Sequence, residues 1–188
     1  MYSLLKKINC LLYPFSDEEW QVLEQKHTLK FLKKGEYLVK ENKACDTISF
    51  ICRGIFVSYF NGDTKKRVRG FFTEGNYISD YRSFLTQQPA TTAVQAAEDC
   101  EVLQISHKQL EECYTLGKAY EKWGRKMAEQ SYVAMFDRIQ ALSLLTYKER
   151  YLLLQQENPA ILQKVPQYMI ASYLGITPEA FSRLRKNI

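Results

Sequence analysis

Hydrophobic and polar residues alternate over short stretches of the chain between about residues 30 and 105. Val, Ile, Phe, Tyr and Thr dominate these stretches, and Gly, Asn and Asp separate them, as in TISFICRGIFVSYFNGDTKKRVRGFF and TTAVQAAEDCEVLQIS. This pattern is typical of short antiparallel strands. Asn61 and Gly62 predict a tight hairpin, because both residues accept the positive φ that the centre of such a turn requires. Several strands at this spacing favour a small barrel or roll over a parallel sheet.

Helical patterns flank the predicted strands on both sides. FSDEEW fits the start of a short helix, because the side chains of Ser16 and Glu19 can each bond the backbone N–H group of the other residue. After His107 the strand pattern stops, and a long stretch without proline contains only Gly117 and Gly124 as helix-weakening residues. We therefore predict one long helix over residues 108–142.

This long helix carries two apolar stripes in which residues recur every three or four positions. One stripe contains Met135, Ile139 and Leu142, and Gln130 and Asp137 interrupt the apolar surface. The other stripe is the one that we assign to dimerisation. Its residues are Leu116, Tyr120, Trp123, Met127 and Ala134. One stripe then covers the barrel and the other contacts a second subunit; the alternative is a helix that only packs on its own barrel.

A second, helical domain is predicted over residues 143–188. The segment SLLTYKERYLLLQQENP indicates a helix that stops near Asn158, because a residue before proline is steered away from the helical region. Two short helices follow in QYMIASYLGITPEAFSRLRK. Gly175 fits the left-handed residue that ends the first helix, Thr177 can cap the second, and Pro178 suits its first turn. Two helices joined in this way form the helix-turn-helix pattern, whose second helix lies in the major groove of DNA.

The final helix has two different faces. At about 100° per residue, Ala180, Phe181, Leu184 and Ile188 share one arc, and the opposite arc is polar and mostly cationic. Three residues of the polar arc are predicted to read bases, namely Glu179, Ser182 and Arg183. Arginine pairs with the acceptors of guanine, and glutamate accepts from the amino group of cytosine. Contacts with DNA phosphates are predicted for Gln167, Thr177, Pro178, Arg185 and Lys186. The alternative is an amphipathic helix whose charged face is only solvated.

The charge distribution agrees with a polyanionic partner. The chain has 188 residues and a net charge of +5, and after residue 160 four Lys and Arg residues accompany a single acidic residue, Glu179. A basic end of this kind suggests binding to a polyanion. No stretch approaches the roughly 18 consecutive apolar residues of a transmembrane helix. We therefore expect a cytoplasmic protein without membrane contact.

The sequence contains no pattern of a metal site or of an enzyme. Its five cysteines are scattered without a Cys-x-x-Cys pair, which argues against zinc or an iron–sulfur cluster. A haem would need an axial ligand within the predicted strands, and His27 and His107 lie outside them. No catalytic triad, phosphate-binding glycine loop or recognisable pair of carboxylates is present. We therefore expect no cofactor, no metal and no enzymatic activity.

The segment QYMIASYLGITPEAFSRLRK resembles the helix-turn-helix of the CRP/FNR superfamily of bacterial transcription regulators. Glu179, Ser182 and Arg183 stand where that family has its base-reading Glu, Ser and Arg. The segments KKGEYLVKE and FICRGIFVSYF are similar to its cyclic-nucleotide-binding-type β-roll. The resemblance implies an α+β fold: an N-terminal antiparallel β-roll (a double-stranded β-helix) in residues 1–107, a long dimerisation helix in 108–142 and an all-helical DNA-binding domain in 143–188. It also implies a homodimer on near-palindromic double-stranded DNA, with RNA polymerase as a further candidate partner.

Two departures from the family pattern affect these expectations. Members that bind cyclic nucleotides hold the phosphate with a Gly-Glu pair and an Arg-Ser/Thr step, and the present chain has Ser79-Asp80 and Ala90-Thr91 instead. Without the arginine a buried phosphate lacks its charged partner, so cAMP is not expected to bind. A candidate pocket for another effector comprises Ser79, Asp80, Arg82, Thr91 and Thr92. The family's β-hairpin wing has no counterpart after the last helix, either because a subgroup lacks it or because the sequence is cut short.

These observations favour a sequence-specific DNA-binding transcription regulator that does not respond to cAMP. The alternative is a small-molecule sensor or scaffold whose C-terminal domain contacts a protein partner. The cationic face that carries Arg183 and Lys186 argues against this alternative.

Overall fold

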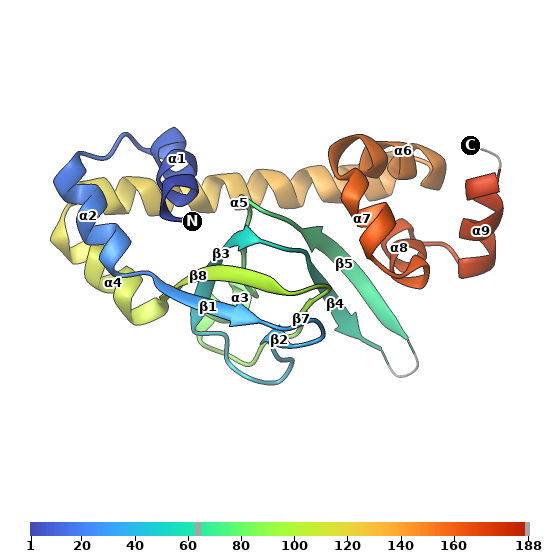
Figure 1. Cartoon of the computed structure of the whole chain (residues 1–188), viewed down its shortest axis with the longest axis horizontal. Coiled ribbons are helices and arrows are strands. Elements are labelled where there is room, and N and C mark those ends of the chain that lie inside the picture. The colour runs from blue at the N-terminus through green and yellow to red at the C-terminus, as the bar shows by residue number, and fades with distance from the viewer. Residues whose placement is uncertain (63–64, 187–188) are drawn as a thin grey trace.

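Two antiparallel sheets form the N-terminal half of the molecule (Figure 1). The structure is a computed structural model that describes residues 1–62 and 65–186. Within these residues the sheets have four strands each, in the orders β1-β8-β3-β6 and β2-β7-β4-β5. The strands are β1 (Thr28–Leu32), β2 (Tyr37–Val39), β3 (Thr47–Arg53), β4 (Phe56–Asn61), β5 (Lys66–Phe72), β6 (Tyr77–Ile78), β7 (Ala93–Ala96) and β8 (Cys100–Ser106). Ile51 and Val102 of one sheet share a buried cluster with Phe56 and Val94 of the other, so the sheets enclose a common core.

Helices precede, interrupt and follow this roll (Figure 1). They are α1 (Tyr2–Leu12), α2 (Asp17–Gln25), α3 (Tyr81–Thr86), α4 (His107–Leu116), α5 (Lys118–Leu144), α6 (Tyr147–Glu157), α7 (Pro159–Lys164), α8 (Gln167–Leu174) and α9 (Pro178–Lys186). The predicted α+β fold, with an antiparallel roll followed by helices, is confirmed. The capping box of Ser16 and Glu19 is also present at the start of α2.

Strands β4 and β5 pair with each other as predicted, but Asn61 lies in their ladder and not at the centre of a turn. Asn61 pairs with Lys66 and so belongs to the β4–β5 ladder. The N–H group of Gly62 donates to the carbonyl oxygen of Lys65 at 3.1 Å, which continues the pairing by one step. Residues 63 and 64, which follow, are outside the described part of the chain.

The predicted long helix is two helices, α4 and α5. Gly117 has an extended backbone (φ 164°, ψ 161°) and separates them. At Gly124 the ring of Tyr114 from α4 lies where a Cβ atom would be, so a larger residue would push the two helices apart. The helix that runs along the roll therefore begins at Lys118 and ends at Leu144.

A buried asparagine ties α1 to α5 and β6. The Oδ1 atom of Asn9 accepts from Trp123 Nε1 at 2.6 Å and from the hydroxyl of Tyr77 at 2.9 Å, while its Nδ2 donates to the carbonyl oxygen of Leu5 at 2.8 Å. Buried polar groups need such partners, because an unpaired one costs about 1–3 kcal/mol. The N-terminal helices are thus fixed on α5 by polar as well as apolar contacts.

This packing corrects the assignment of the dimer face. Trp123 is only 1% exposed and Tyr120 4%, and both belong to the core that α1 and α2 form with the roll. Met127 packs against the same core, so these three residues of the stripe are covered by their own chain. Of the other two residues assigned to it, Leu116 lies on α4 and Ala134 is exposed on α5. The exposed large apolar residues of α5 are Tyr132, Val133, Met135, Phe136, Ile139, Leu142 and Leu144.

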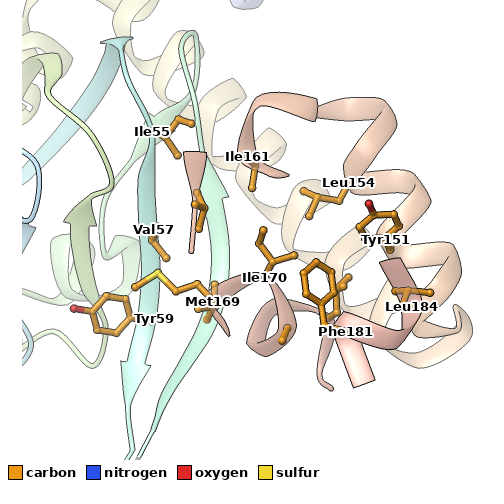
Figure 2. Close-up of a cluster of buried hydrophobic side chains, with 14 of the residues drawn as sticks. Ile55, Val57, Tyr59, Tyr151, Leu154, Ile161, Met169, Ile170, Phe181 and Leu184 are labelled. Atoms are coloured by element: carbon orange, nitrogen blue, oxygen red, sulfur yellow. The ribbon is translucent and has the colours of Figure 1, made fainter. Parts of the chain in front are cut away.

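The C-terminal helices share a hydrophobic cluster with the outer side of the second sheet. Figure 2 shows Val57 and Tyr59 on the sheet side of this cluster, with Met169 of α8 reaching towards them. Ser172 of α8 adds polar contacts, because its Oγ accepts from the N–H group of Val68 at 2.9 Å and donates to the carbonyl oxygen of Lys66 at 3.0 Å. The helices after residue 143 are therefore docked on the roll.

Candidate nucleic-acid interface

The last two helices meet at a turn that the local sequence determines. Gly175 has a left-handed backbone (φ 75°), and its N–H group donates to Ser172 O while that of Ile176 donates to Ala171 O. These bonds satisfy carbonyl groups that the end of α8 would otherwise leave free. Thr177 then caps α9, since its Oγ1 accepts from the N–H group of Ala180 at 3.2 Å.

The two faces of α9 are arranged as the sequence predicts. Phe181 is 1% exposed and Leu184 7%, and both belong to the cluster of Figure 2. Glu179, Ser182 and Arg183 are exposed on the other side of the helix. The residues predicted to contact phosphates are exposed as well: Gln167, Thr177, Pro178, Arg185 and Lys186. Ile188, which the periodicity places on the buried arc, lies outside the described residues.

The exposed face of α9 carries both a carboxylate and unpaired cations. Hydrogen bonds with its own backbone N–H group and with Thr177 lower the pKa of Glu179, and the positive charges of Lys65 and Arg183 act in the same direction. Glu179 is therefore an ionised acceptor at neutral pH. Among the described residues, Arg183, Arg185 and Lys186 form no ion pair with an acidic side chain. The face can thus accept hydrogen bonds at its first turn and attract phosphates at its last.

The residues predicted to line an effector pocket include one buried acidic side chain, Asp80. Asp80 is 3% exposed, and its carboxylate is used within the chain. It accepts from the N–H groups of Ser83 at 3.0 Å, Thr91 at 3.2 Å and Thr92 at 3.0 Å, and from the hydroxyl of Thr92 at 2.7 Å.

The neighbours of Asp80 are engaged or turned outward in the same way. The hydroxyl of Ser79 donates to Thr47 O at 3.0 Å, and the side chain of Arg82 is exposed on α3. Asp80 thus holds this loop together, and the effector pocket stays a prediction.

Comparison with known proteins identifies the central part of the chain. Residues 29–115 match the family model described as cyclic nucleotide-binding domain. This segment is a cyclic nucleotide-binding domain. No curated protein matches the sequence. Within the described residues, no helix is long and apolar enough to cross a membrane.

The similarity to solved structures extends beyond this domain to most of the chain. A putative CRP/FNR-family transcriptional regulator from Eubacterium rectale is 13% identical with a TM-score of 0.71, and the match covers 93% of this chain and 83% of that one. FixK2 from Bradyrhizobium japonicum is 19% identical with a TM-score of 0.69, over 86% and 83% of the two chains. The catabolite activator protein of Thermus thermophilus is 14% identical with a TM-score of 0.60, over 94% and 85%. The chain therefore has a cyclic nucleotide-binding domain within the fold of CRP/FNR regulators, as the sequence resemblance implies.

In the cyclic nucleotide-binding domain, replacing Asp80 with Asn is expected to lower the free energy of unfolding by about 2–3 kcal/mol near pH 7, because charge-assisted hydrogen bonds are removed. Burial alone would raise the pKa of Asp80, but the hydrogen bonds from Ser83, Thr92 and Thr91 bring it below its ordinary value of 3.8. The stabilisation is therefore complete well above pH 3.8 and disappears as the pH falls through the folded-state pKa. Urea unfolding at several pH values measures this difference.

The matched control is Asp17→Asn, which removes an exposed carboxylate that pairs with Lys6. This variant should unfold almost as the wild type does, because exposed ion pairs contribute little. Equal stability of wild type and Asp80→Asn at pH 7, or a difference that grows in acid, would show that Asp80 does not hold the loop.

Two arginines that the sequence analysis missed fix the end of α8. Arg138 of α5 lies over the ring of Tyr173, 3.7 Å from its centre, and its Nη2 donates to Tyr173 O at 2.8 Å. Arg150 of α6 donates to Leu174 O at 2.7 Å and to Leu145 O at 2.6 Å. They satisfy carbonyl groups at the ends of α8 and α5 and complement the dipoles of these helices. No local pattern could reveal this, since each arginine contacts the end of a helix other than its own.

Proposed function

We propose that the chain is a homodimeric transcription regulator that recognises DNA sequence through α9. The observation that carries this proposal is the division of α9: Phe181 and Leu184 are buried, while Glu179, Ser182 and Arg183 stand together on the exposed side. A helix that presents such residues next to a helix-turn-helix corner fits the major groove. The solved structures with this fold include proteins described as transcription regulators.

Each exposed residue has a chemical role in this proposal. Arg183 offers two parallel donors to O6 and N7 of guanine, and the ionised Glu179 accepts from the amino group of cytosine. Ser182 bonds a base edge or a phosphate. Phosphates are held by Arg185 and Lys186 and by the start of α9 around Thr177. These phosphate contacts fix position, whereas Arg183 and Glu179 specify sequence.

A dimer follows from the exposed apolar stripe of α5. Tyr132, Met135, Ile139 and Leu142 recur every three or four residues along one side of the helix, and each is about half exposed in the single chain. Two copies of α5 packed along this stripe would bury it. The two α9 helices would then contact half-sites one helical turn of DNA apart, about 34–36 Å. The expected operator is therefore near-palindromic.

The proposed regulator works in the cytoplasm and does not catalyse a reaction. It acts on RNA polymerase, and it does not need cAMP. The loop of the cyclic nucleotide-binding domain supports the independence from cAMP. The N–H groups of Ser83, Thr91 and Thr92 already donate hydrogen bonds to the carboxylate of Asp80, so they are not free to bind a phosphate. The negative charge of this buried carboxylate would also repel the phosphate of cAMP.

Selection from a pool of random duplexes tests the proposed function. We expect the full chain to enrich a near-palindromic sequence and to bind it at least about a thousandfold more tightly than a scrambled duplex at the same salt concentration. Addition of cAMP should not change either affinity. If no sequence is enriched and all duplexes bind equally, the chain is not a sequence-specific regulator, and a protein partner for α9 becomes the better hypothesis.

A further inference from the structure

Few directional contacts join the long helix α5 to the last two helices of the chain. Figure 1 shows α6 and α8 near the C-terminal end of α5. Among the described residues, two arginines supply the hydrogen bonds that join α8 or α9 to α5 or α6. Arg138 donates from α5 to Tyr173 O, and Arg150 donates from α6 to Leu174 O. Both acceptors are at the C-terminal end of α8.

Arg150 bridges two helix ends with one guanidinium group. Its Nη1 donates to Leu145 O at 2.6 Å, directly after α5, and its Nη2 donates to Leu174 O at 2.7 Å, at the end of α8. A guanidinium group is planar, and its donors form a fork of fixed geometry. The two helix ends are therefore held in one relative position.

Tyr173 provides a second point of attachment. The guanidinium group of Arg138 lies 3.7 Å from the centre of its ring, in addition to the hydrogen bond of 2.8 Å to its carbonyl oxygen. The ring of Phe71 in β5 lies 5.0 Å from the same ring. One residue at the end of α8 thus contacts both α5 and the roll.

The apolar contacts of α6 do not fix an angle in the same way. Tyr151 and Leu154 of α6 share the cluster of Figure 2 with Phe181 and Leu184 of α9. Hydrophobic contacts are non-directional, whereas a hydrogen bond weakens steeply when it is bent. The orientation of α8 and α9 relative to α5 therefore depends on the two arginines.

The two arginines are costly to bury. In the described part of the chain neither forms an ion pair with an acidic side chain, and their Nε atoms are buried there without a hydrogen-bond partner. Burial, together with the charge of Arg150, lowers the pKa of Arg138. Ionic groups placed in this way contribute little net stability, and their best-attested use is to specify one arrangement among several.

We propose that Arg138 and Arg150 are specificity-determining positioning residues, which set the spacing between the two half-sites of the operator. The inference rests on the proposed function, in which two α5 helices pack together and each α9 enters a major groove. The joint then fixes the distance and the rotation between the two α9 helices. One additional base pair moves a half-site by about 3.4 Å and turns it by about 34–36° around the DNA axis. A rigid joint accepts one spacing, and a loosened joint accepts several.

Duplexes that carry two selected half-sites at different spacings test this role. We expect the wild type to lose at least about tenfold in affinity when the spacing is two base pairs longer or shorter, because a dimer that cannot reach both half-sites loses the gain from the second. Arg150→Gln and Arg138→Gln should each bind all these duplexes within about threefold, because a loosened joint reaches both half-sites at every spacing. Their affinity for a duplex with a single half-site should equal that of the wild type, since neither arginine lies on α9.

Arg125→Gln is the matched control, because Arg125 is exposed on α5 and pairs with Glu129 of the same helix. It should keep the wild-type preference for one spacing. The proposal is wrong if the wild type binds all spacings equally, or if the Arg138 and Arg150 variants keep the wild-type preference. It is also wrong if both variants lose affinity for the single half-site, which would assign the arginines to the stability of the domain.

A measurement without DNA separates this inference from the proposed function. Spin labels on Ser182→Cys, in a protein that also carries Cys10→Ser, report the distance between the two α9 helices of a dimer by double electron–electron resonance. The other four cysteines are buried. We expect a narrow distribution of distances when Arg150 is present and a broad one for Arg150→Gln. Equally narrow distributions would contradict the role of the joint, whereas failure to enrich any duplex would contradict DNA recognition alone.

Discussion

Replacing both Met135 and Ile139 with glutamate is expected to give a monomeric protein and to weaken binding to the selected operator at least about a hundredfold. Each of these side chains is 52% exposed in the single chain, and both lie at the centre of the stripe from Tyr132 to Leu142. Two copies would place four carboxylates in an interface that excludes water, where unpaired charges are very unfavourable. A monomer binds one half-site at a time. It therefore lacks the gain in affinity that linking two binding sites provides, which is typically 10²- to 10⁴-fold.

The control for this variant is a pair of glutamates elsewhere on the same helix. Gln130 and Gln140 are exposed. Although the sequence analysis placed Gln130 in the apolar surface, both residues lie about 100° or more around the helix from Met135 and Ile139. Gln130→Glu with Gln140→Glu therefore adds the same charge without entering the interface. Sedimentation velocity gives the mass of each protein, and titration of labelled operator gives its affinity. A Met135→Glu, Ile139→Glu protein that remains dimeric, or one that is monomeric and still binds normally, would show that α5 is not the dimer helix.

Arg183→Ala is expected to remove most of the preference for the selected operator over a scrambled duplex. A bidentate arginine–guanine pair discriminates against other bases by about 1–3 kcal/mol, which is about 5- to 150-fold for each half-site. Arg183 is exposed and has no role in the core, so the variant should fold and dimerise as the wild type does. Affinity for scrambled DNA should fall much less, because phosphate contacts supply most of that binding.

Arg185→Ala is the matched control, since Arg185 is exposed on the same helix two residues further on. It should weaken binding to both duplexes by the same factor and reduce the slope of log K against log salt by about 0.9 for each phosphate that the variant no longer neutralises. Titrations over a range of salt concentrations give both quantities. If Arg183→Ala behaves like Arg185→Ala, Arg183 contacts phosphates and does not read bases.

The sequence predicts the last two helices and the turn between them well because their determinants are local. Gly175 needs a left-handed backbone, Thr177 caps the next helix, and the alternation of Phe181 with Arg183 along α9 assigns its faces. Each of these features depends on residues within one or two helical turns. The same applies to the capping box of Ser16 and to the strands of the roll.

The sequence does not predict which stripe of α5 is covered, because this depends on distant segments. Trp123 becomes buried only when α1 places Asn9 beside it, 114 residues away in the sequence. Asp80 illustrates the same limit, since three of its four hydrogen bonds come from Thr91 and Thr92, on the far side of α3. Long-range contacts of this kind leave no periodic signal in the chain.

The central claim is that Arg183 contacts a guanine in the major groove, and substitution of that guanine by 7-deazaguanine tests it most directly. The substitution replaces the N7 acceptor by a carbon and leaves base pairing intact. We predict that the affinity of the wild type falls about five- to tenfold or more at this position, whereas Arg183→Ala binds the two duplexes equally. If the affinity of Arg183→Ala falls as much as that of the wild type, the contact with guanine belongs to another residue, and the proposed orientation of α9 on DNA is wrong.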